Sequence, residues 1–167
     1  SGANSKLDAA GLDDSFTEFI DSGFIGDGGS YSDTNVMVSA GGLMKARYLI
    51  NFGAGFESTA TVTVTGDGSV IDAGGQFSLG GGENNTAILN IANGGLVKTT
   101  SSVDTIDLAE SIFLGTEAIT GSTVTVNLLN SLPGVNPPQS RLESVQVIWV
   151  GGTFGAELVL GIPTNIN

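Results

Sequence analysis

The sequence contains neither cysteine nor histidine in its 167 residues. Without cysteine there are no disulfides, no thiolate metal sites and no thiol nucleophiles. Without histidine there is no Ser-His-Asp triad and no histidine-ligated zinc. These two absences remove the usual routes to nucleophilic and zinc-dependent catalysis.

Basic residues are scarce as well: five lysines and arginines stand against 17 acidic residues, which gives a net charge of −12. Such a chain has no basic patch that could displace counterions from a phosphate backbone, and anionic membranes repel it. Its apolar runs are all shorter than the roughly 20 residues that a membrane span requires. We therefore expect neither a nucleic-acid partner nor membrane insertion.

Glycine, by contrast, is abundant, and its 26 residues recur in a pattern. Short runs of alternating apolar residues are each followed by Gly-Gly or Asp-Gly and then by another aliphatic residue; these runs are Val36–Val38, Val62–Val64 and Leu89–Ile91. A phenylalanine or leucine followed by glycine also marks each coil, and this glycine stands nine residues before an alternating run three times: Gly53 before Val62, Gly80 before Leu89, and Gly115 before Val124. A repeated spacing of this length is typical of solenoids.

The pattern predicts an all-β fold, a short right-handed parallel β-solenoid of three to four coils with a period of about 27 residues. Counted from Gly26, the markers are separated by 27, 27 and 35 residues, so the third coil carries an insertion within Thr100–Glu110. Each coil holds three short strands with alternate side chains pointing inward. Two internal columns follow: Val36, Val62, Leu89 and Val124 in one, and Val38, Val64, Ile91 and Val126 in the next.

We divide the chain into four segments. Residues 1–22 are predicted to form an N-terminal helical cap, with a short acidic helix that begins at Asp13 or Asp14 and ends near Asp21. Residues 23–127 form the solenoid, and residues 128–143 form a loop rich in proline and asparagine. Residues 144–167 hold a C-terminal pair of strands and a tail, and the pair is either a hairpin or the closing rung.

The stretch Leu89–Val97, which reads LNIANGGLV, carries a resemblance to a known group, together with Phe77-Ser-Leu-Gly80 before it. Over residues 35–127 the pattern resembles the Gly-rich repeats of autotransporter-type and PEP-CTERM-associated bacterial surface proteins. The resemblance implies a secreted β-solenoid at the cell surface, usually without enzymatic activity.

Calcium is the metal that the acidic turns suggest, because carboxylate and carbonyl oxygens suit this ion. The candidate ligands are Asp27, Asp33, Asp67 and Asp72. None of them belongs to a strict calcium-binding motif. The alternative is that these aspartates form turns by accepting hydrogen bonds from their own backbone.

Two functions remain. The first is a structural subunit that associates with copies of itself through the solenoid ends and by strand exchange to build a surface filament or coat. The candidate contacts are Phe16, Phe19, Val145, Val147 and Trp149. The alternative is a carbohydrate-binding adhesion module in which Tyr31, Tyr48 and Trp149 stack on sugars. Carboxylate-pair hydrolysis is still open, but a few coils offer no long substrate groove, so we expect no enzyme.

Ice binding through outward threonines is also conceivable, since Thr61, Thr63 and Thr65 alternate along one strand. The equivalent positions in neighbouring coils include Met37 and Asn90, which break the ladder. The threonines are more simply β-branched residues on an exposed strand face.

Overall fold

A computed structural model describes residues 6–8, 24–26, 30–100, 111–115, 122–129, 140–144 and 148–150. Within these ranges every regular element is a β-strand, and all strand pairs are parallel. No helix in the described residues is long and apolar enough to span a bilayer.

The strands form three sheets, which we name A, B and C. Sheet A contains, in spatial order, β1 (Lys6–Asp8), β4 (Leu43–Ala46), β7 (Val70–Ala73), β10 (Leu96–Thr99) and β13 (Arg141–Glu143). Sheet B contains β2 (Phe24–Gly26), β5 (Leu49–Phe52), β8 (Gln76–Leu79), β11 (Ile112–Leu114) and β14 (Ile148–Val150). Sheet C contains β3 (Asp33–Ser39), β6 (Thr59–Thr65), β9 (Thr86–Ala92) and β12 (Thr123–Leu129).

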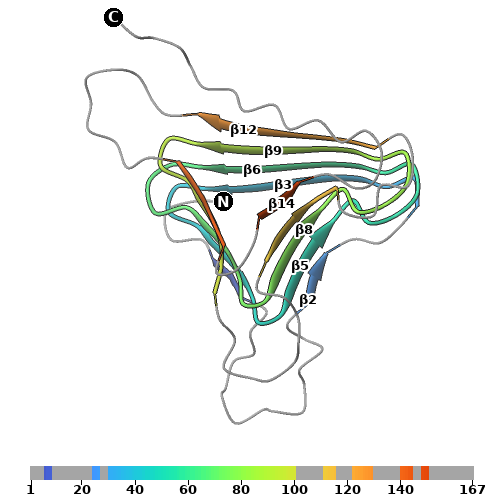
Figure 1. Ribbon diagram of the computed structural model, residues 1–167. Helices are drawn as coiled ribbons and strands as arrows, with labels where there is room; N and C mark the ends of the chain where they lie inside the picture. The colour runs from blue at the N-terminus through green and yellow to red at the C-terminus, as the bar shows by residue number, and fades with distance from the viewer. Residues whose placement is uncertain are drawn as a thin grey trace, which may run out of the picture.

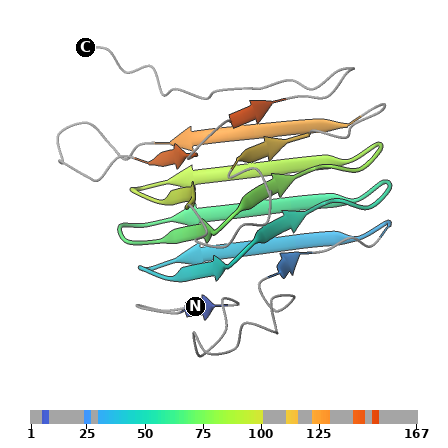
Figure 2. The ribbon, with the colours of Figure 1, turned by 60° about the horizontal axis from the view of Figure 1, so that its bottom comes forward.

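The chain visits sheets A, B and C in turn and then repeats, so each sheet forms one side of a triangular coil (Figure 1). Successive coils lie on top of one another, with the strands of each sheet running side by side (Figure 2). A neighbouring strand in such a stack lies about 4.8 Å away. The parallel β-solenoid is confirmed; its right-handed sense stays a prediction.

The stack extends beyond the residues that carry the repeat pattern. Among the described residues, sheets A and B have five strands each and sheet C has four, against the three to four coils expected. The additional strands are β1 at one end and β13 and β14 at the other. β13 lies inside the range expected to be a loop, and Leu128 and Leu129 belong to β12. β14 pairs in parallel with β11, so it continues the coil.

The predicted N-terminal helix, including Asp13, Asp14 and Asp21, falls outside the described residues. The part of the 1–22 segment that is described, Lys6–Asp8, is a strand in register with β4. Leu7 stands beside Met44 in that register. Alternation of an apolar residue between two charged ones suits a strand with one face toward the core, so β1 adds a rung where a helical cap was expected.

Alternate residues of the strands point to the inside of the triangle. The residues at these inward positions are mostly aliphatic, with few aromatics. Buried residues are supplied by all three sheets, and a phenylalanine at position 77 is the largest that is fully buried. The core consists of Val38, Met44, Ala46, Ile50, Phe52, Ala60, Val62, Val64, Ile71, Ala73, Phe77, Leu79, Ala87, Leu89, Ile91, Val97, Ile112, Leu114, Val124 and Val126.

The register confirms most of the expected columns and corrects the last rung. Val62 lies beside Val36 and Leu89, as predicted. Leu89, however, pairs with Val126, and Val124 pairs with Ala87. The structural equivalent of Val62 therefore stands 11 residues after Gly115, where the other coils have nine. Gly26 is also displaced: it pairs with Asn51, two residues before the Gly53 marker.

The marker glycines mark a real corner. Gly53, Gly80 and Gly115 all have a positive φ, between 67° and 75°. At Gly80 an added Cβ would lie 2.8 Å from the Ala87 Cβ and 3.0 Å from a Val124 methyl carbon. Glycine is required there both for the backbone conformation and for the close approach of the next rung.

A buried polar ladder occupies the corner where sheet B leads into sheet C. Ser58, Asn85 and Ser122 each immediately precede a sheet C strand and are at most 2% exposed. The Asn85 side-chain oxygen accepts from the Ser58 amide at 2.9 Å, and its Nδ2 donates to the Gly53 carbonyl. The Asn85 amide donates to Ser122 Oγ at 3.0 Å. These bonds satisfy backbone groups that the turn leaves unpaired between coils.

Candidate functional site: the C-terminal rung

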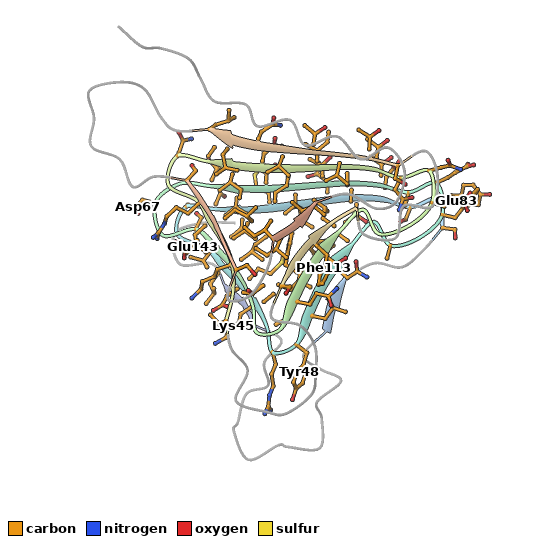
Figure 3. The ribbon with its side chains drawn as sticks, in the orientation of Figure 1. Lys45, Tyr48, Asp67, Glu83, Phe113 and Glu143 are labelled. Carbon is orange, nitrogen blue, oxygen red and sulfur yellow. The ribbon has the colours of Figure 1, made fainter. Side chains whose placement is uncertain are left out.

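The predicted calcium ligands do not come together in the described part of the chain. Asp33 and Asp67 are exposed and lie at opposite ends of sheet C; Figure 3 labels Asp67 at its corner. Asp72 is buried in sheet A, 3.4 Å from the Lys98 ammonium, and accepts a hydrogen bond from Thr100 at 2.8 Å. Asp27 lies outside the described residues, among which no three acidic, histidine or cysteine side chains could hold a metal together.

The proposed sugar-stacking residues are separated too. Tyr48 is only 4% exposed at the vertex between sheets A and B, with the Arg47 guanidinium 5.3 Å from its ring centre (Figure 3). A buried ring cannot stack on a sugar, so the expectation for Tyr48 is wrong. Tyr31 is 72% exposed and meets Phe56 edge-on, with 5.7 Å between ring centres. For Trp149 only the backbone is described, as part of β14.

The threonine face of sheet C is interrupted where the sequence indicated. Thr63 lies between Met37 and Asn90 in the register. The amides in this column bond to their neighbours: Asn127 donates to Asn90 at 2.8 Å, and Asn90 donates to Thr63 at 3.4 Å. These side chains therefore support the stacking of coils.

Cations gather on one of the three sheets. The five basic residues of the chain are Lys6, Lys45, Arg47, Lys98 and Arg141, and all of them lie in sheet A or, for Arg47, directly after its strand β4. Figure 3 shows Lys45 and Glu143 on this side of the triangle. One register column of sheet A alternates in sign from rung to rung, in the order Asp8, Lys45, Asp72, Lys98 and Glu143.

The C-terminal rung is the place where the apolar interior opens. In one internal column of sheet B, Ile50, Phe77 and Ile112 are 0% exposed. Ile148 continues that column from β14 and is 42% exposed. Leu129, at the end of β12, is also 42% exposed, but it lies beside Ala92 on the outer face of sheet C and does not belong to the interior. An apolar column that ends in solvent is the feature expected of an unfilled contact surface.

The same rung presents an ion pair. The Arg141 guanidinium lies 3.0 Å from a Glu143 carboxylate oxygen, and their side chains are 58% and 47% exposed. Leu142 between them packs partly against the core. The sequence did not indicate these residues. Arg141 and Glu143 lie in the range 128–143, which was predicted to be a loop, and Ile148 lies in the predicted C-terminal pair of strands, where it was not named as a contact. Of the assembly residues named from the sequence, Phe16, Phe19, Val145 and Val147 lie outside the described residues.

Comparison with models of protein families, with curated proteins and with solved structures found no match.

Proposed function

We propose that this chain is a non-enzymatic structural protein that associates with copies of itself through the ends of its solenoid. Its arrangement suits a rigid building block, because a single hydrophobic cluster connects successive coils and the ends carry the unpaired strand edges. Among the described residues, β12, β13 and β14 each pair with a strand on one side only.

The observation that carries this proposal is the exposure of Ile148. Three residues of its column are fully buried, whereas Ile148, in the same register one rung further on, is 42% exposed. Covering an aliphatic side chain of this size contributes on the order of 1 kcal/mol, since full burial is worth about 1.5–3 kcal/mol. A second copy seated on this end would supply the missing rung.

Sedimentation velocity over a wide range of protein concentration tests the proposal. We expect oligomers to form as concentration rises, and Ile148→Ser to weaken them. A protein that stays monomeric at its highest soluble concentration would contradict self-association.

The location that we propose is outside the cell, at the surface, where the oligomers form a filament or coat. Its support is the resemblance of residues 35–127 to Gly-rich surface repeats. Fractionation of cells that produce the natural full-length protein tests it: recovery only from the cell interior would refute the location and leave the association intact.

Carbohydrate binding is the second candidate, and the exposed ring of Tyr31 is the observation in its favour. A glycan array with Tyr31→Ala and Trp149→Ala variants separates the two functions. Binding that either substitution abolishes would favour adhesion; an array without signals would favour the structural role alone.

A further inference from the structure

The two end strands of sheet A have the same charge order. β1 reads Lys6-Leu7-Asp8 and β13 reads Arg141-Leu142-Glu143, so each has a cation, a leucine and an anion in turn. In the strands between them one outer column pairs opposite charges throughout, since every neighbour of Lys45, Asp72 and Lys98 in that column carries the opposite charge. This order decides how a second copy can approach.

Head-to-tail stacking would continue the coil, but it would place like charges beside each other. If β1 of a second copy followed β13 in the same register, Arg141 would lie beside Lys6 and Glu143 beside Asp8 of that copy. Like charges placed directly opposite on neighbouring strands are destabilising. The alternation of sign along this column would fail for the first time at the junction.

A two-fold arrangement reverses the order of the second strand and resolves this conflict. When two copies of β13 pair antiparallel about Leu142, Arg141 of each copy faces Glu143 of the other. Leu142, which packs against the core from the last rung, then meets its own counterpart and lengthens the internal column of Met44, Ile71 and Val97. One rotation therefore satisfies both the charged outer face and the apolar inner face.

The rotation also places the exposed end of sheet B of one copy against the end of sheet C of the other copy. A two-fold axis normal to sheet A exchanges the other two sides of the triangular coil (Figure 1). The end of sheet B that carries Ile148 thus faces the sheet C end of the second copy, where Leu128 packs against the core. Apolar side chains meet apolar side chains across the junction, as in the centre of stable interfaces.

We propose that the C-terminal rung is a self-complementary surface, and that two copies of this chain join head to head through antiparallel pairing of Arg141-Leu142-Glu143. This inference rests on the proposed self-association and specifies its geometry. The contact is isologous, because the same patch serves both partners, and it closes after two copies at this end.

Charge reversal with full-length protein tests the geometry. Arg141→Glu alone places two glutamates opposite each other, and Glu143→Arg alone places two arginines opposite each other. Each variant should dimerise about tenfold more weakly or worse, since two cross-strand pairs change from attractive to repulsive. Mixed in equal amounts, the two variants are complementary again, and dimerisation should return to near the wild-type strength.

Lys45→Glu and Asp67→Arg are matched controls, because they make the same changes of net charge away from this rung. Both should dimerise like the wild type. Sedimentation is measured at physiological ionic strength, where repulsion between two chains of charge −12 is screened beyond about 8 Å. Melting temperatures verify folding, and Arg141→Gln with Glu143→Gln repeat the test with smaller perturbations if a reversal destabilises the fold.

The outcomes are distinct. A wild type that remains monomeric at every concentration would overturn the proposed self-association itself. A wild type that associates, with single reversals that have no effect or a mixture that does not recover, would overturn only the head-to-head contact. Reversals that strengthen association would also overturn it and indicate head-to-tail stacking, because the glutamate introduced by Arg141→Glu would then lie beside Lys6, and the arginine introduced by Glu143→Arg beside Asp8.

Discussion

Ile112 and Ile148 occupy the same internal column on adjacent strands, yet one is 0% and the other 42% exposed. Inside the stack, each rung is covered above and below, so an aliphatic side chain contributes its full burial to the folded state. At the last rung the same type of side chain is partly exposed and can be buried by a second molecule. The position of an isoleucine along the solenoid axis, and not its residue type, therefore decides whether it stabilises the fold or stays exposed for contact with another molecule.

The most severe test of this difference is the same truncation at both positions. Ile112→Ala should reduce the free energy of unfolding by about 2–5 kcal/mol, because it leaves a cavity that the neighbouring rungs cannot close. Ile148→Ala removes the same atoms from a partly solvated site and should cost less than half as much. Chemical denaturation at a concentration where the protein is monomeric gives both values. Equal losses would show that the last rung is as well covered as the interior.

The buried polar ladder at Asn85 and the outward-facing asparagine column at Asn127 offer a second comparison. The expected difference in stability is smaller. Asn85→Ala leaves the buried Ser58 amide without its acceptor and removes a donor from the Gly53 carbonyl, so we expect a loss of about 1–3 kcal/mol. Asn127→Ala removes an amide from the solvent-facing column and should cost well under half of that. Thermal denaturation distinguishes the two, and a comparable decrease in both variants would contradict a special role of the buried corner.

Ion pairs on sheet A give the smallest difference. Lys98→Ala removes the partner of the largely buried Asp72, and Arg141→Ala removes the partner of the exposed Glu143. We expect about 1 kcal/mol for the first, between the values for exposed and buried pairs, and roughly half or less for the second. Urea unfolding measures both. A greater loss for Arg141→Ala would reverse the ranking by burial.

The sequence was sufficient to predict the fold class because glycine spacing and apolar alternation repeat together. Gly53 and Gly80 occupy equivalent corners, and Val36, Val62 and Leu89 share one column as expected. A solenoid imposes these features on every coil: a corner needs a particular backbone conformation, and the interior needs an apolar side chain at alternate positions.

Features that do not repeat were harder to predict. Val126 was assigned to the column of Ile91, the next one along the strand, because the connection after Gly115 is two residues longer than in the preceding coils. β13 was missed because proline and asparagine dominate the preceding stretch and conceal a three-residue strand. The role of Asn85 was not predicted, because its side chain bonds to residues of a neighbouring coil. In each case the determining partner lies in another rung, far away in sequence.

In-register stacking of parallel coils is the property on which the core columns, the buried ladder and the open last rung all depend. The chain has no cysteine, so a pair of introduced cysteines reports on it directly. Ile88 and Thr125 are register partners on the outer face of sheet C. Neighbouring strands lie about 4.8 Å apart, within the Cα separation that a disulfide accepts.

Ile88→Cys with Thr125→Cys should therefore form an intramolecular disulfide in the folded protein, detected by mass spectrometry of unreduced peptides. The matched pair Ile88→Cys with Thr123→Cys, which would be in register if Val124 stood beside Leu89, should remain reduced because its diagonal separation of roughly 8 Å exceeds the reach of a disulfide. Cross-linking of the second pair, or of neither, would contradict the stacking of the coils described above.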